Sequence, residues 1–263
     1  MTRFAHVKVR KEPYYRREAI EKGLKNLGYT IWPALHPTRR EDLLVLWNKK
    51  RGADEDAADR WEAAGGTVLV LENGYLQKVD KTMYAISVHG HNGSGWFPVG
   101  DEDRFSRLGF EVKPWCTGGE YVLVCAQRGI GSKLMASPPG WAEKVGKLHS
   151  KHGLVKIRPH PGNFVAKVSL EKDLADASVC HIWSSGAGVR ALVEGVPVQH
   201  YAPHWICSEA SLGGAFDPCY GGCDTARAKA LHHMSHGQWS VDEIASGEPF
   251  ARILDQLEHA TWP

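Results

Sequence analysis

Apolar and polar residues alternate with two different periods over the first seventy positions, which predicts strands and helices in turn. Continuous apolar runs predict strands at residues 4–9, 29–34, 43–47 and 67–71. Helical apolar spacing predicts a helix over residues 14–27, ended by Gly28, and another over residues 54–64, ended by Gly65 and Gly66. This alternation predicts a parallel sheet that helices cover on both faces.

A less regular stretch follows, from Glu72 to about Pro114. It includes residues 84–88 and a loop, residues 89–95, whose glycines and polar side chains are typical of a functional loop. Residues 113–120 are the candidate linker, because Pro114, Gly118 and Gly119 interrupt regular structure there.

The strand and helix pattern then restarts and predicts a second α/β sheet. Strands are expected at residues 121–126, 154–158, 179–183 and 196–201, and helices at 139–150, 170–175 and 188–194. From Thr225 onward the chain is predicted helical, in two pieces split around His236 and Gly237. We therefore expect an α/β protein with Rossmann-like domains over residues 1–118 and 119–230, and with C-terminal helices over residues 231–263 that pack back toward the first domain.

Composition excludes some classes of protein. Of 263 residues, 43% are hydrophobic and 24% charged, and no apolar run approaches the roughly 18 residues that a membrane span needs. The N-terminus has no apolar signal core, so we expect a cytoplasmic protein. Six cysteines are scattered, and the spacing of Cys219 and Cys223 before His232 and His233 favours a glycine-rich loop with thiols over a zinc site, so no metal is expected.

The net charge of +2 is too small to identify a nucleic-acid-binding protein, but the positive charges are unevenly distributed. Basic residues crowd the first strand and helix, which predicts an electropositive edge. The alternative is a solvated helix face with pairs such as Glu18 with Lys22. The basic residues are Arg3, Lys8, Arg10, Lys11, Arg16, Arg17, Lys22 and Lys25.

Candidate chemistry lies in three loops, each of which follows a predicted strand of the second half. Ligands of open parallel sheets bind outside the carboxyl ends of the strands. Residues 127–132, 158–162 and 184–188 occupy those positions, and all three segments are polar or rich in glycine. We expect them to meet at one ligand site.

The third loop is the best candidate for holding phosphate. Ser184 and Ser185 lead with two glycines into a helix, whose free N–H groups favour an anion. Ser185 equally fits a simple helix cap. Glu194 comes near the end of that helix, where a carboxylate is unfavourable, and a ribose on the ligand would explain it.

The other two loops supply cations. Arg158 and His160 flank Pro159 at a strand end, where arginine can grip phosphate oxygens and histidine can donate to a leaving phosphate. Arg128 of the first loop is counted with Arg158 and His160 as a residue that binds the ligand. A lone His-Pro pair is otherwise typical of a turn.

These segments together resemble glycosyltransferases of the GT-B fold. The resemblance rests on Arg-Pro-His-Pro (158–161), Ser-Ser-Gly-Ala-Gly-Val (184–189), Ala-Leu-Val-Glu-Gly-Val-Pro-Val (191–198) and the tail from Gln238 to Phe250. It covers roughly residue 121 to the C-terminus. More narrowly, the set is similar to capsule-polysaccharide and sialyl-type transferases and to small phage-encoded relatives.

The resemblance implies two Rossmann-like domains facing each other across a cleft, with a nucleotide sugar in the C-terminal half and an acceptor in the N-terminal half. It implies a UDP-sugar first among donors, no tightly bound metal or other cofactor, and the host cytoplasm if a phage encodes the chain. His160, Ser184 and Ser185 match residues that contact the donor phosphates, and Glu194 matches a ribose-binding glutamate. The N-terminal half matches no motif of the family.

The general base and the acceptor are therefore inferred on physical grounds. Glu72 ends the fourth predicted strand and is the first choice for the base, while Asp101 and His91 are alternatives, and each also fits an ordinary loop residue. The basic N-terminal edge and nearby aromatic residues favour duplex DNA bearing a 5-hydroxymethylpyrimidine as one acceptor, beside saccharides and small molecules. A nucleotide-sugar epimerase or hydrolase and a non-catalytic nucleic-acid-binding protein are the alternatives.

Overall fold

The computed structural model describes residues 2–34, 36–78, 82–101, 103–162, 168–212 and 224–259. The chain divides into two compact units. The first comprises Met1–Gly100, Gly131–Lys133 and His236–Pro263, and the second comprises Asp101–Ile130 and Leu134–Ser235. The chain thus leaves the first unit after residue 100, whereas the sequence predicted a boundary at residue 118. It returns to the first unit briefly at residues 131–133 and again from residue 236 onward.

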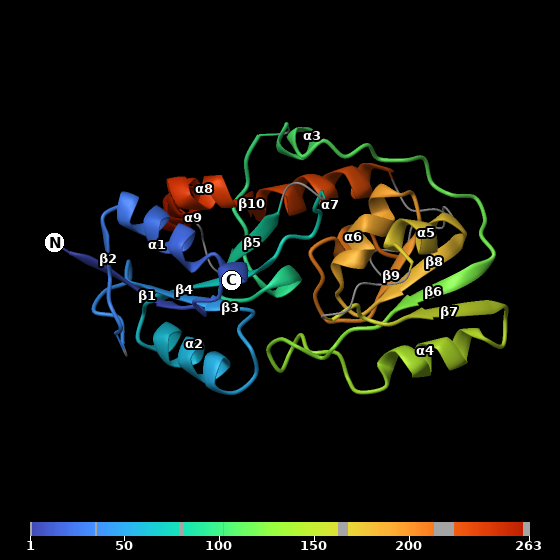
Figure 1. Cartoon of the computed structure of the whole chain (residues 1–263), viewed down its shortest axis with the longest axis horizontal. Helices are drawn as coiled ribbons and strands as arrows, with labels where there is room; N and C mark the ends of the chain where they lie inside the picture. Colours follow the sequence, from blue (N-terminus) through green and yellow to red (C-terminus); the bar gives the residue numbers. More distant parts are fainter. Residues whose placement is uncertain are drawn as a thin grey trace. The chain divides into compact units, whose positions relative to one another are not determined.

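The first unit alternates strands and helices through its N-terminal part (Figure 1). Its elements are β1 (Arg3–Lys8), η1 (Pro13–Tyr15), α1 (Arg17–Asn26), β2 (Tyr29–Ile31), β3 (Leu43–Trp47), α2 (Ala53–Ala63), β4 (Thr67–Asn73), β5 (Met83–Val88), η2 (Asn92–Ser94), β10 (Gln238–Ser240), α8 (Val241–Ser246) and α9 (Glu248–His259). Its described strands form one sheet in the order β10-β5-β4-β3-β1-β2.

The two faces of this sheet are covered by different helices because side chains alternate along each strand. Leu43 and Val45 of β3 pack in the same core as Ile20 and Leu24 of α1, and the C-terminal helices join that core. Leu44 and Leu46 point to the opposite face and pack against Ala58 and Trp61 of α2. Figure 1 shows α1 and α2 on opposite sides of the sheet. The apolar run of β3, buried at every position, is thereby explained.

The parallel arrangement predicted for the first four strands of the first unit is confirmed, but the sheet also contains two antiparallel strands that the sequence did not predict. Strands β2, β1, β3 and β4 are parallel, but β5 runs antiparallel to β4, and β10 runs antiparallel to β5. Residues 84–88, which the sequence placed in an irregular stretch, are therefore a buried strand. The pattern missed β10 as well, because three residues are too short to show a period.

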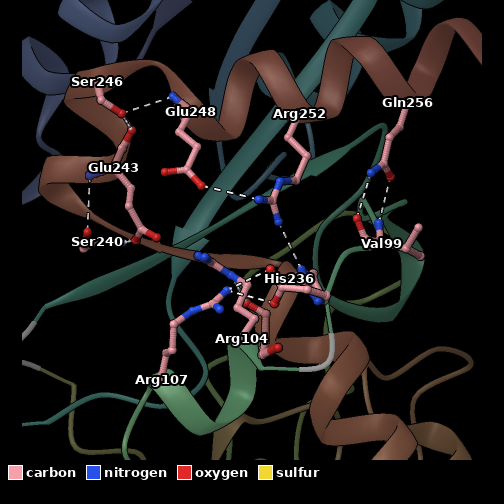
Figure 2. Close-up of polar contacts among 12 residues, drawn as sticks. Val99, Arg104, Arg107, His236, Ser240, Glu243, Ser246, Glu248, Arg252 and Gln256 are labelled. Carbon is pink, nitrogen blue, oxygen red and sulfur yellow. Dashed lines mark hydrogen bonds and ion pairs between the residues drawn. The ribbon is translucent and has the colours of Figure 1, made fainter.

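Hydrogen bonds tie the C-terminal segment into the first unit, as Figure 2 shows. Ser240 and Glu243 form a reciprocal capping box that starts α8. The Gln256 side chain of α9 donates to the Val99 carbonyl at 2.7 Å and accepts from the Val99 amide at 2.8 Å. Phe250 and Ile253 of α9 are fully buried in the core that α1 covers.

The second unit contains a smaller sheet in which every described pairing is parallel. The strands lie in the order β7-β6-β8-β9. Its elements are α3 (Arg104–Arg107), β6 (Tyr121–Cys125), α4 (Trp141–His149), β7 (Leu154–Arg158), α5 (Leu170–Ala175), β8 (Ala177–Ile182), α6 (Gly186–Val193), β9 (Val198–His200), η3 (Ser208–Ala210) and α7 (Asp224–His236), of which the final residue, His236, belongs to the first unit.

The order of these strands creates a switch point between β6 and β8. From β6 the chain passes through α4 to β7 on one side, and it then continues through β8 to β9 on the other side. Trp141 and Val145 of α4 pack against Val124 of β6 on one face of the sheet. Crevices outside the carboxyl ends of the strands at such a point are the usual ligand sites of open parallel sheets.

Among the helices built from the described residues, none combines the length and the apolar character needed to cross a membrane. Cys219 and Cys223, considered above for a metal site, lie outside the described residues.

Candidate functional site at the carboxyl edge of the four-stranded sheet

The loops after β6 and β8 meet directly at the switch point of the second unit. Gln127 lies two residues after the end of β6, and its side-chain oxygen accepts a hydrogen bond from the Ser184 backbone N–H at 2.6 Å. Ser184 lies two residues after β8 and is buried. This bond fixes the start of the loop that enters α6 against the loop after the central strand.

The N-terminus of α6 faces this junction and begins with a conventional cap. The Ser185 hydroxyl accepts from the Ala187 N–H at 3.1 Å, so the capping role expected for serine is present. The positive end of the helix dipole then lies beside Gln127 and Ser184. Gly188 lies on the buried face of α6, where an added Cβ would lie 2.5 Å from Ile182 and 2.8 Å from Trp205. The glycine at this position thus lets α6 approach the sheet closely.

The loop after β7 brings His160 near Arg128. The Gly162 N–H donates to Nδ1 of His160 at 2.8 Å, which leaves the proton of the neutral imidazole on Nε2. Partial burial of the ring, followed by the positive charge of Arg128, lowers the pKa of His160 below its usual 6.5. The histidine is therefore a neutral donor near pH 7, close to an exposed arginine.

Arg158 is occupied by a partner within the second unit. Its guanidinium pairs with the Asp173 carboxylate of α5 and donates to the Val168 carbonyl at 2.9 Å. Lys156 contacts the other oxygen of Asp173 at 2.6 Å. Burial alone would raise the pKa of Asp173, but the hydrogen bonds and charges of these two cations outweigh burial and hold it below its usual range. Arg158 thus anchors α5 to β7.

Glu194 lies at the other end of α6 from Ser185. An eight-residue helix spans about 12 Å, so the carboxylate is far from the junction of the loops. Glu194 pairs with Lys113 and with Arg190 at 3.1 Å. These two cations account for a carboxylate at a helix C-terminus, which the sequence alone had explained by a ribose.

The fold has known counterparts although the sequence has none at the level of families. No protein-family model and no curated protein sequence matches the chain. Solved structures match over nearly the whole chain. The α/β fold of the chain is similar to that of solved transferase structures. At this level of sequence identity the likeness concerns the fold alone.

Two of the similar structures come from Thermosulfurimonas dismutans KpsC. Its beta Kdo 2,7 transferase is 12% identical with a TM-score of 0.56, over 98% of this chain and 100% of that chain. Its beta Kdo 2,4 transferase is 13% identical with a TM-score of 0.58, over 97% of this chain and 98% of that chain.

The carboxylates considered as a general base have structural partners. Glu72 lies within β4, opposite Ala85 of β5, and its Oε1 accepts from the Tyr75 hydroxyl at 2.7 Å and from the Asn92 N–H at 2.8 Å. Asp101 is in the second unit and pairs with Arg107 at 2.9 Å. Glu72 thus holds the loop after β5, and Asp101 holds α3.

His91 is buried in the same loop of the first unit, and its backbone carbonyl accepts from the Ser94 hydroxyl at 2.8 Å. Gln127 is the site residue that sequence reasoning passed over. The signal was its position directly after a buried strand, beside the named Arg128. Within the part of the chain that the structure describes, no cluster of three or more His, Cys, Asp or Glu side chains could hold a metal ion.

Proposed function

We propose that this protein is a glycosyltransferase that moves a sugar from a nucleotide-activated donor to a hydroxyl group. The observation that carries the proposal is the junction at the switch point of the second unit, where Gln127 binds the Ser184 amide beside the N-terminus of α6. A helix N-terminus and nearby cations are the usual elements that hold a diphosphate. The similarity in fold to two Kdo transferases supports the same class of reaction.

In this proposal the donor phosphates rest on the amides at the start of α6, near Ser184 and Ser185. Arg128 supplies a guanidinium, and the Nε2–H of His160 donates to a phosphate oxygen. As the glycosidic bond breaks, negative charge grows on the departing phosphate, and donors that are already oriented stabilise that charge. Arg158 is assigned to the fold because Asp173 occupies its guanidinium.

The finer expectations from the sequence belong to the same proposal. They are a UDP-sugar as donor, a GT-B arrangement of two domains, kinship with capsule-polysaccharide, sialyl-type or phage-encoded transferases, and a 5-hydroxymethylpyrimidine in duplex DNA as one acceptor. Glu72, Asp101 and Glu194 are the least favoured of the named site residues, because their carboxylates are engaged in contacts that stabilise the fold.

The test is a thermal-shift panel of nucleotide sugars, beginning with UDP-sugars and including a Kdo donor, followed by mass analysis of acceptors incubated with the best ligand. Arg128→Ala should weaken nucleotide binding by about 1–3 kcal/mol, the scale of a charge-assisted hydrogen bond. Lys151→Ala is the matched control, since it removes an exposed cation after α4, away from these loops.

Absence of binding by every nucleotide sugar would refute the proposal. Turnover of the donor without any acceptor would instead favour the nucleotide-sugar hydrolase or epimerase considered from the sequence.

A further inference from the structure

A cavity of about 690 Å³ opens at the carboxyl edge of the six-stranded sheet, wholly within the first unit. We call it the β1 pocket. Its lining comes from the ends of β1 and β2 and from the segment after β3. Strand β1 lies between β2 and β3, so the chain leaves it in one direction and returns on its other side. The pocket therefore occupies the switch point of this sheet, which is the usual place for a ligand.

The charge of the β1 pocket is strongly biased. Lys8, Arg10, Arg17 and Lys50 line it, and Asp54 is the one carboxylate among its described lining residues. Lys8 contacts Asp54 at 2.8 Å, so this pair is neutral together. Arg17 pairs with Glu21 outside the lining, so Arg10 and Lys50 give the cavity a net positive charge that an anionic ligand would neutralise.

The three cations other than Lys8 differ in how firmly they are held. Arg17 is fixed by Glu21 at 2.6 Å and by the Val9 carbonyl at 2.9 Å. The Arg10 guanidinium lies 5.8 Å from the centre of the Tyr15 ring. Neither Arg10 nor Lys50 forms an ion pair with any residue that the structure describes. These two side chains are therefore available to a ligand.

Aromatic rings complete the lining. Trp32 follows β2 and is 57% exposed, although tryptophan side chains are highly buried on average. Trp47 and Tyr15 stack edge to face at 4.9 Å on the opposite side of the β1 end and are held in the core. A flat ring face beside cationic groups suits a ligand that carries both an apolar ring surface and a negative charge.

We propose that the β1 pocket binds a saccharide that bears a carboxylate or a phosphate, with Arg10 and Lys50 on the anionic group and Trp32 against the ring. Calling this ligand the acceptor of the transfer rests on the proposed function, whereas the binding itself does not. The cavity is of the size that holds a small ligand or the last rings of a chain.

The same features argue against duplex DNA at this site. Non-specific and specific binding of a duplex both depend on many phosphate contacts spread along its length. Here the cations gather in one concave cavity, and two of them, Lys8 and Arg17, are already paired with carboxylates.

The experiment compares three tetrasaccharides that differ only in the last ring, which is glucuronic acid, glucose 6-phosphate or glucose. Dissociation constants are measured by calorimetry for the full chain and for an R10A/K50A double variant. Both residues project from loops, so the variant should fold, and its melting temperature checks this. Lys25→Ala is the matched control, because Lys25 is an exposed cation of α1 that does not line the pocket.

We expect at least one acidic tetrasaccharide to bind roughly tenfold or more tightly than the neutral one, and R10A/K50A to abolish that preference, as loss of charge-assisted bonds would do. Lys25→Ala should leave it unchanged. Asp54→Asn should bind the acidic ligand as tightly or more tightly, because it removes a negative charge and releases Lys8. The acidic tetrasaccharide that binds more tightly shows whether the pocket prefers a carboxylate or a phosphate.

Equal binding of acidic and neutral tetrasaccharides would overturn the proposal. The proposal would also be overturned if a DNA duplex bearing 5-hydroxymethylcytosine bound more tightly than the acidic tetrasaccharides and the R10A/K50A variant lost that binding. Nucleotide-sugar binding, measured on the same proteins, separates the two hypotheses: a chain that binds the acidic saccharide but no nucleotide sugar retains the β1 pocket and loses the proposed function.

Discussion

Replacing His181 should change how the stability of the second unit depends on pH. His181 is 4% exposed in β8, and its Nδ1 lies 2.9 Å from the Tyr201 hydroxyl. Burial, followed by the nearby His149, lowers the pKa of His181 from 6.5 to about 4. The unfolded chain therefore takes up a proton near pH 6.5 that the folded chain refuses until about pH 4, so stability is lost as the pH falls through this window.

The size of the effect follows from the two pKa values. A difference of about 2.5 pKa units corresponds to about 3 kcal/mol in full, of which about 2 kcal/mol is lost between pH 7 and pH 5. The variant His181→Asn keeps an acceptor for Tyr201 and removes the titration. It should lose about 2 kcal/mol less than the wild type over the same interval, although it is less stable at pH 7.

Urea unfolding at pH 7 and pH 5, followed by circular dichroism and tryptophan fluorescence, measures both values. His152→Asn is the control, since His152 is exposed, and it should retain the wild-type loss. If His181→Asn loses as much stability as the wild type, His181 is not the group that resists protonation.

Three further outcomes are expected. Gly23→Ala should destabilise the first unit by about 1–3 kcal/mol or more, because its Cβ would lie 2.0 Å from the Ile244 carbonyl oxygen of α8; Gly153→Ala, which meets nothing within 4 Å, is the control in thermal melts. Asp173→Asn should cost about 1–3 kcal/mol in urea unfolding, because it removes the charge that pairs with the half-buried Arg158, and an unchanged midpoint would contradict the anchoring role. Gln127→Ala should weaken nucleotide binding about tenfold in calorimetry with a smaller loss of stability, since it removes the bond that fixes the Ser184 amide; binding equal to that of the wild type would show that the junction is not the donor site.

Much of the alternating architecture was predictable because parallel strands buried on both faces leave continuous apolar runs. The apolar runs at β3 and β6 were placed to within a residue, and so were the helix α5 and the strand β7, although β7 is mostly exposed. The strand β5 was missed because a glycine-rich loop follows it, and β10 was missed because its three residues are too few to show a period, although Trp239 is buried in the core of the first unit. Such pairings depend on contacts between distant parts of the chain.

Candidate site residues show the same division. The polar loops after β6, β7 and β8 could be found from their positions at strand ends, because parallel strands bring their carboxyl ends to one edge. The sequence could not show which of these side chains remain available to a ligand, because that depends on the ion pairs they form within the fold. Asp173 takes Arg158, and Lys113 and Arg190 take Glu194.

Most strands and helices, and the edges at which they end, follow from local periodicity and from glycine and proline at the breaks, with β5 and β10 as exceptions. Tertiary structure alone decided the order of the strands, the return of residue 236 onward to the first unit, and the gathering of Arg10, Trp32 and Lys50 around one cavity. The physical reason is that a charge or a ring acquires its role from the neighbours that desolvate or pair with it, and those neighbours are set by packing across the whole chain.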